Sequence, residues 1–158
     1  MSRTHISASI AAMTIVCALA LPAHAGARAK RIVSPFSIHG VSIADTAARV
    51  RSRFGPPIRT SYGDGFVASR FVYRNVDIGF DEDGRVVSVV ARSTKACFDR
   101  SVCLGTSYAD ALRRLRDIGA VTLDGDAHAQ LADGDSGCWL EITNRRGRIS
   151  ALDIRCEP

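Results

Sequence analysis

One segment of the sequence occurs twice, and this repetition constrains the fold more than any other feature. Residues 40–55 (GVSIADTAARVRSRFG) align with residues 105–119 (GTSYADALRRLRDIG). In both copies a Gly, a Ser, an Ala-Asp pair, two arginines around a branched apolar residue and a closing Gly recur in the same order. Such self-similarity predicts a chain built from two similar units that pack together.

Each copy predicts an α-helix. Ser42 and Ser107 suit the N-cap position, because a serine hydroxyl accepts a hydrogen bond from a first-turn amide. An aspartate follows near the positive end of each helix dipole, and a glycine ends each segment. Apolar residues recur at helical spacing, so each helix has one side that must pack against another element. They are Ile43, Ala47, Val50 and Phe54 in the first copy, and Tyr108, Ala111, Leu112 and Leu115 in the second.

Strand-like segments follow the first helix. Residues 66–74 and 76–80 are rich in aromatic and β-branched side chains, which favour strands. The turn at Asp81-Glu82-Asp83-Gly84 then leads into a further strand over residues 85–92.

A similar hairpin follows the second helix. Residues 138–143 and 148–156 alternate apolar and polar side chains around a turn at residues 144–147. The preceding residues 125–137 are polar and Gly-rich, which predicts a shorter or weaker strand there. We therefore expect an α+β fold of two tandem helix-plus-β-hairpin repeats, with the helices packed on one face of an antiparallel sheet. The predicted boundaries are a signal peptide over residues 1–25, a linker over 26–37, and repeats over 38–96 and 97–158.

The N-terminus has the features of a secretory signal peptide. Arg3 precedes an apolar run from Ile10 to Leu21, and Ala23-His24-Ala25 forms a small-residue cleavage site. The run is about 12 residues long, against the ~20 needed to cross a bilayer. We expect cleavage after Ala25, no transmembrane anchor, and a periplasmic or secreted protein. Cys17 raises the alternative of lipidation, but the residues before it lack the Leu-small-small pattern of lipid-attachment signals.

Four cysteines remain after the predicted cleavage: Cys97, Cys103, Cys138 and Cys156. An even number in an exported chain favours two disulfides, which allow three pairings. The short 97–103 loop and the position of Cys138 and Cys156 at the outer ends of the predicted hairpin favour the pairs 97–103 and 138–156. Their spacings lack the paired C-x-x-C form of zinc sites, so we expect no metal.

The sequence offers no recognisable catalytic arrangement. His39 and His128 lie far apart, without the spacing of metal ligands or of a nucleophile and its base. The acidic turn at residues 81–84 is too short to supply the oxygens that calcium needs. The net charge of +5 comes from interleaved arginines and acids, which favours a solvated surface over nucleic-acid binding. We expect neither catalytic residues nor a cofactor.

Alternation along the second predicted hairpin separates its two faces. Cys138, Leu140 and Ile142 share the apolar face, whereas Trp139 and Glu141 point the other way. Aromatic residues and arginine carry most of the energy of protein interfaces. The predicted binding residues are Trp139, Glu141, Asp153 and Arg155, with Tyr62, Arg70 and Tyr73 in the first copy. The alternative for Tyr73, and the favoured interpretation for Phe71, is a place in the core against Val50 and Phe54.

These motifs resemble a known family. The Gly-x-Ser-x-x-Asp helix, Phe54-Gly55-Pro56 and the Phe80–Val86 turn resemble the BamE/SmpA (outer-membrane assembly lipoprotein)-like superfamily over residues 38–93. Residues 104–156 match at helix and hairpin only, and the doubling resembles the β-lactamase inhibitor protein. The resemblance implies a helix-backed sheet that binds another protein.

We therefore expect an exported, non-catalytic protein-binding module. It would serve as an inhibitor or immunity protein for a secreted or periplasmic enzyme. The alternatives are an envelope structural or assembly factor of the BamE type and an unrecognised enzyme.

Overall fold

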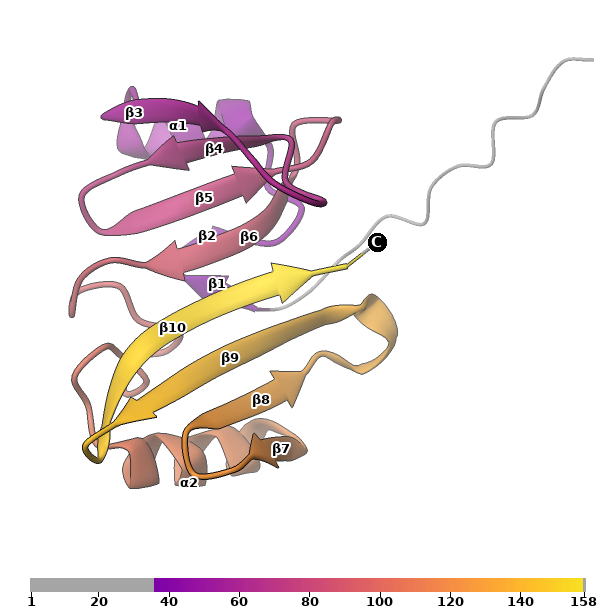
Figure 1. Cartoon of the computed structure of the whole chain (residues 1–158). Helices are drawn as coiled ribbons and strands as arrows, with labels where there is room; N and C mark the ends of the chain where they lie inside the picture. The colour runs from indigo at the N-terminus through magenta and orange to yellow at the C-terminus, as the bar shows by residue number, and fades with distance from the viewer. Residues whose placement is uncertain (1–35, 158) are drawn as a thin grey trace, which may run out of the picture.

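The computed structural model describes residues 36–157, so the predicted signal peptide, Cys17 and most of the linker lie outside the described residues. The elements in chain order are β1 (Ser37–Ile38), β2 (Val41–Ser42), α1 (Ala47–Phe54), β3 (Arg59–Tyr62), β4 (Ser69–Val72), β5 (Val76–Phe80), β6 (Val86–Ala91), α2 (Tyr108–Ile118), β7 (Val121–Asp124), β8 (His128–Ala132), the 3-10 helix η1 (Gly134–Ser136), β9 (Cys138–Arg145) and β10 (Arg148–Cys156). Strands β3 to β10 form one antiparallel sheet in the order β3-β4-β5-β6-β10-β9-β8-β7 (Figure 1). The sheet is therefore joined in its middle, where β6 pairs with β10.

The predicted α+β fold of two helix-plus-hairpin repeats is wrong. Strands dominate the described chain, whose α-helices are only 8 and 11 residues long. Four strands follow each helix and join the sheet, whereas the sequence predicted three strands after the first helix and a hairpin with one weaker strand after the second. The prediction missed β3 and β7, because short strands with mostly exposed residues have no clear alternation and are stabilised by pairing with their neighbours. The weaker strand expected within residues 125–137 is present as β8.

The first helix also begins later than predicted. Thr46 is its N-cap and accepts a hydrogen bond from Arg49 N at 3.2 Å. Ser42 instead ends β2, and its N–H donates to the Asp45 carboxylate at 3.0 Å, in a turn where Ala44 has a φ of 66°. The second helix begins as predicted, with Ser107 as its N-cap.

The core lies on one face of the sheet. A cross-strand row on that face consists of Phe71, Ile78, Val89, Ile154, Leu140 and Leu131, all at most 4% exposed. The Arg51 side chain of α1 lies 4.6 Å from the Phe71 ring centre, and α2 buries Ala111 and Leu115. Both helices lie behind the sheet in Figure 1. We call this side the helix-covered face and the opposite side the free face.

Two disulfides confirm the favoured pairing. Cys97 bonds to Cys103, and Cys138 bonds to Cys156. Cys138 and Cys156 are directly opposite each other in the β9–β10 ladder, and both are buried. The second disulfide therefore fastens the two long strands at the end where the chain leaves the sheet.

The small loop closed by the first disulfide is fixed to α2 by Asp99. Its carboxylate accepts hydrogen bonds from Ser101 N at 2.7 Å, Val102 N at 2.9 Å and Arg114 Nε at 2.8 Å. Partial burial alone would raise the pKa of Asp99, but these hydrogen bonds lower it to about 2. The ionised carboxylate therefore stabilises the folded protein.

We predict that Asp99→Asn lowers the free energy of unfolding at neutral pH by about 1 kcal/mol, because the ion pair and charge-assisted hydrogen bonds are weakened. A carboxyl with a lowered pKa stabilises the fold above its unfolded pKa of 3.8, and this contribution is lost as the pH falls through about 2. Urea unfolding at a series of pH values should show a shallower acid dependence in the variant. Asp110→Asn is the control, since its exposed carboxylate pairs with Arg113 on the same helix. Equal acid dependence in the wild type and Asp99→Asn would contradict the prediction.

Candidate binding cleft

Two cross-strand rows on the free face contain most of the predicted binding residues. The first row consists of Val72, Asp77, Val90, Asp153, Glu141 and Gln130. The second row, two residues further along the strands, consists of Arg70, Gly79, Ser88, Arg155 and Trp139. The pairing of β6 with β10 thus brings Arg70 from the first half of the chain onto the same row as Trp139 and Arg155 from the second.

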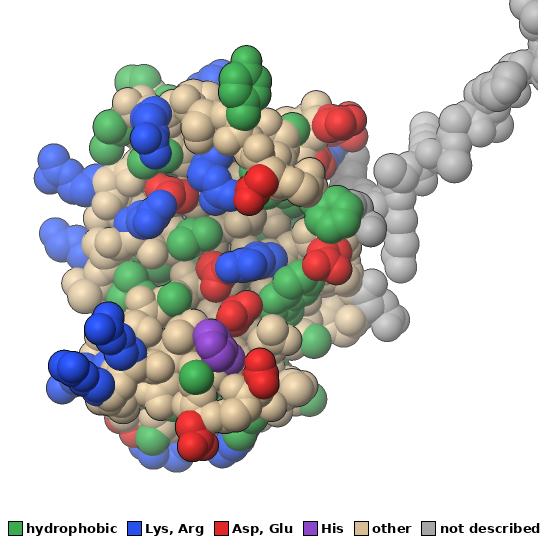
Figure 2. All heavy atoms as spheres, in the orientation of Figure 1, with side chains coloured by type: hydrophobic (Ala, Val, Ile, Leu, Met, Phe, Trp, Pro, Cys, Tyr) green, Lys and Arg blue, Asp and Glu red, His purple; other side chains and the backbone are tan. Residues whose placement is uncertain are grey.

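A cleft of about 380 Å³ lies over the second row. Its lining residues are Asp64, Gly65, Phe66, Val67, Arg70, Val87, Ser88, Val90, Trp139, Arg155, Cys156 and Glu157. Figure 2 shows this face of the molecule, with acidic and basic side chains interleaved across its middle. The cleft therefore combines aromatic and aliphatic surface with charges of both signs.

The loop between β3 and β4 forms part of the cleft. Val67 in this loop lies against Gly79 of β5, where a Cβ would come within 2.9 Å of a Val67 methyl carbon. Because Gly79 has no side chain, the loop approaches the sheet closely. Phe66 beside it remains 57% exposed and contributes an aromatic ring to the cleft.

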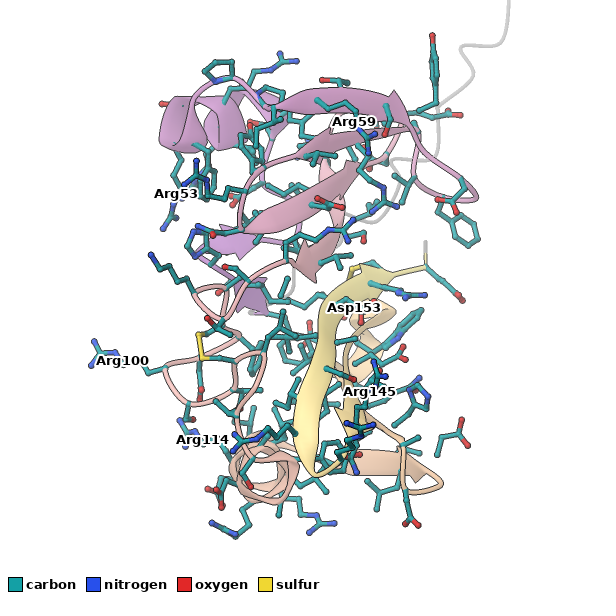
Figure 3. All side chains as sticks on the ribbon, turned by 60° about the vertical axis from the view of Figure 1, so that its left-hand side comes forward. Arg53, Arg59, Arg100, Arg114, Arg145 and Asp153 are labelled. Atoms are coloured by element: carbon teal, nitrogen blue, oxygen red, sulfur yellow. A yellow bond between two sulfur atoms is a disulfide. The ribbon has the colours of Figure 1, made fainter. Side chains whose placement is uncertain are left out.

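Arg155 is held by a buried carboxylate. Its Nε donates to Asp153 Oδ2 at 2.5 Å, and Asp153 is only 5% exposed. Asp153 lies on β10 (Figure 3). Burial raises the pKa of Asp153, although the Arg155 guanidinium opposes that rise. The ion pair fixes the guanidinium end of Arg155, while the side chain as a whole stays 57% exposed.

A second pair of this kind lies two strands away. Asp77 is 1% exposed, and its Oδ2 accepts hydrogen bonds from Arg92 Nε at 2.7 Å and from an Arg92 terminal nitrogen. The other oxygen, Oδ1, is buried and has no hydrogen-bond partner among the described residues. Asp77 and Asp153 are the two cross-strand neighbours of Val90. The middle of the free face thus contains two buried carboxylates, each neutralised by one arginine.

Trp139 lies opposite Arg155 in the β9–β10 ladder and is partly buried. Its indole N–H is buried, and no hydrogen-bond acceptor for it is present in the described part of the chain. Buried polar groups normally have a partner. The nitrogen has no accessible surface, so in this conformation it is not open to a molecule in the cleft.

The structure separates the other predicted binding residues from the cleft. Glu141 lies in the neighbouring row, 3.4 Å from His128 Nδ1. Tyr62 is 96% exposed, at the end of the edge strand β3. Tyr73 is 8% exposed on the helix-covered face, where its hydroxyl donates to Gly55 O at 3.1 Å and its ring packs against Phe54. Tyr73 therefore occupies the core position that was its alternative.

Phe66 is a cleft residue that the predicted binding set missed. The sequence pattern assigned it to a strand over residues 66–74, whereas β4 begins only at Ser69. The Gly63-Asp64-Gly65 segment before it was the available signal, since two glycines around an aspartate are typical of a turn.

Within residues 36–157, no group of three or more His, Cys, Asp or Glu side chains is arranged to hold a metal ion. The helices of that same range include none with the length and apolar character needed to cross a membrane.

Comparisons with known proteins give a likeness of fold. No family model matches the chain, and no curated protein matches it. It is similar to the solved structure of an extracellular protein containing an SCP domain from Bacillus anthracis, with 12% identity and a TM-score of 0.52 over 73% of this chain and 44% of that one. This chain thus spans less than half the length of that protein. A DUF4309 family protein from Bacillus subtilis matches with 14% identity and a TM-score of 0.49 over 75% of this chain and 84% of that one.

Proposed function

We propose that the protein is an exported, non-catalytic protein-binding module that holds its partner in the cleft on the free face. The observation that carries the proposal is the convergence of Trp139, Arg70 and Arg155 with the exposed Phe66 around one cleft. Tryptophan, other aromatic residues and arginine dominate binding energy because they bury large areas and retain a polar group. The signal-like N-terminus and the two disulfides support export.

The buried charges of the free face support the same assignment. Asp77 and Asp153 are each at most 5% exposed on a face that no helix covers. Burying an ion pair generally gives little or no net stability compared with apolar residues of the same size. Departures from the most stable arrangement are concentrated at functional sites, and these two pairs fix the surface beside the cleft.

Two forms of this function follow from the resemblances, the BamE/SmpA-like one of residues 38–93 and that of the repeated helix to the β-lactamase inhibitor protein. One is an inhibitor or immunity protein that acts on a secreted or periplasmic enzyme, and the other is an envelope assembly factor. The two forms predict different partners in a co-purification experiment. An inhibitor should co-purify with a soluble enzyme and reduce its activity, whereas an assembly factor should co-purify with membrane proteins.

We expect Phe66→Ala to weaken partner capture by at least about tenfold, since loss of a central aromatic contact commonly costs more than 1.4 kcal/mol. Affinity capture from envelope extracts and culture medium with the tagged protein measures the effect. Trp139→Ala should act in the same direction. Phe66 is the cleaner test, because an exposed side chain contributes little to folding.

The matched control is Leu123→Ala, which removes a similarly exposed apolar side chain from β7 at the far edge of the sheet. It should retain full capture. If Phe66→Ala and Trp139→Ala both bind the partner as strongly as the wild type does, the binding site lies outside the cleft.

A further inference from the structure

The outer edge of β3 is a second exposed feature of the sheet. The two most exposed large apolar side chains of the described chain lie at its ends, Ile58 at 73% and Tyr62 at 96%. Tyr62 is two residues from Thr60, so these two side chains project to the same side of the strand. Ile58 lies just before β3, and its N–H donates to Val72 O at 2.9 Å. Thr60 is exposed as well, so α1 does not bury its side chain. This edge therefore has an accessible backbone and uncovered apolar side chains.

The hydrogen-bond alternation shows which backbone groups face outward. Gly63 N donates to Ala68 O, its cross-strand partner, at 3.2 Å. In an antiparallel ladder the hydrogen-bonded pairs alternate, so Ser61 and Arg59 also direct their N–H and C=O groups toward β4. Thr60 and Tyr62 direct theirs away from the sheet. No other described strand pairs with this side of β3.

We propose that β3 pairs antiparallel with β3 of a second copy of this chain, across a two-fold axis at Ser61. In this register Thr60 of each copy faces Tyr62 of the other, which allows four backbone hydrogen bonds. The Tyr62 ring then lies toward the start of β3 of the second copy, next to which Ile58 is exposed. The interface thus covers the most exposed apolar side chains of both copies with each other.

The charges are compatible with this register. Arg59 lies opposite Gly63 of the second copy, so the two arginines do not face each other directly. Ser61 faces Ser61 at the axis, where two small side chains fit. The sequence of the edge is therefore self-complementary, as a two-fold interface requires.

The pairing has a consequence for binding that rests on the proposed function. A two-fold axis between antiparallel edge strands is perpendicular to the sheet, so both free faces point the same way. The dimer then presents two clefts to one side. A partner with two copies of the recognised surface gains from the second contact, because that contact becomes intramolecular.

Disulfide trapping tests the register directly. At the axis the two Ser61 residues form a non-hydrogen-bonded pair, for which the Cα atoms lie about 4.5 Å apart, within the range that disulfides span. The purified Ser61→Cys protein is oxidised with glutathione disulfide. It should form a covalent dimer about tenfold faster than a control variant whose cysteines in two copies meet only by diffusion. Non-reducing electrophoresis and mass spectrometry measure the rate.

The matched control is Thr122→Cys, an exposed position in β7, the opposite edge strand of the sheet. The backbone groups of Thr122 also point into the sheet. The hydrogen bond from Asn144 N to Ala127 O shows this, because it fixes the alternation along β8 and hence the direction of Thr122, which pairs with Gln130. Thr60→Pro in the Ser61→Cys background should slow trapping, because it removes an outward N–H without touching the β3–β4 ladder. Sedimentation of the wild type should show concentration-dependent dimers that Tyr62→Lys weakens.

Two results would overturn the dimer. One is that Ser61→Cys forms the covalent dimer no faster than Thr122→Cys does, and the other is that the wild type stays monomeric at all concentrations. If Phe66→Ala still loses the partner in that case, the proposed function stands without it. If Ser61→Cys is trapped and no partner is captured, the dimer stands and the proposed function fails.

Discussion

A double Cys138→Ala, Cys156→Ala variant is expected to unfold with a free energy about 3 kcal/mol below that of the wild type. The disulfide closes a loop of 18 residues, and the chain entropy that it removes from the unfolded state corresponds to about that value. Alanine is the suitable replacement, because both cysteines are buried and a serine hydroxyl there would lack a partner. Urea unfolding with a constant m-value gives the difference.

The other disulfide provides the comparison. Cys97 and Cys103 close a loop of only 6 residues, so their double alanine variant should lose about 2 kcal/mol. The first variant should also bind the partner less well, since Cys156 lines the cleft next to Arg155. Equal losses of stability in the two double variants would show that loop entropy does not determine their contributions.

Local alternation was sufficient to predict the second hairpin and its disulfide. Cys138, Leu140 and Ile142 are buried on one face of β9, as their spacing indicates, and Trp139 projects from the other. The same reasoning failed for β3 and β7, the two edges of the sheet. An edge strand such as Arg59–Tyr62 is exposed on most positions, so no apolar period marks it.

The cleft could be predicted only in part, because it depends on contacts between distant segments. The alternation and register of the β9–β10 hairpin place Trp139 beside Arg155, and a single hairpin is enough to predict this. Arg70 joins them only through the pairing of β6 with β10, which no local pattern determines. The position of Phe66 depends on the close approach of Val67 to Gly79, which is likewise a tertiary contact.

The Asp77–Arg92 pair was also missed, although one signal for it was present. Asp77 is the only charged residue in the otherwise apolar strand Val76–Phe80. A lone carboxylate in such a strand needs a counter-charge, and the β5–β6 hairpin register places Arg92 just beyond Ala91, the partner of Val76. The neighbouring strands therefore bring the carboxylate and the guanidinium together.

Arg92→Ala is expected to lower the free energy of unfolding by about 3 kcal/mol, because it leaves a buried carboxylate without its partner. The Asp77 side chain is only 2% exposed, and one of its oxygens already lacks a hydrogen bond among the described residues. We take the low end of the usual range because the Arg92 side chain is 56% exposed, so water can approach once it is removed. Thermal and urea unfolding at neutral pH measure the loss.

The double variant Asp77→Asn, Arg92→Ala separates charge from packing. A neutral amide needs no counter-ion, so the double variant should recover most of the stability that Arg92→Ala loses. Arg74→Ala, an exposed arginine close to the same hairpin, should change stability by less than about 0.5 kcal/mol. A double variant as unstable as Arg92→Ala would assign the loss to the packing of the arginine stem. Recovery, combined with weakened partner capture, would show that the buried charge serves the free face rather than the stability of the fold.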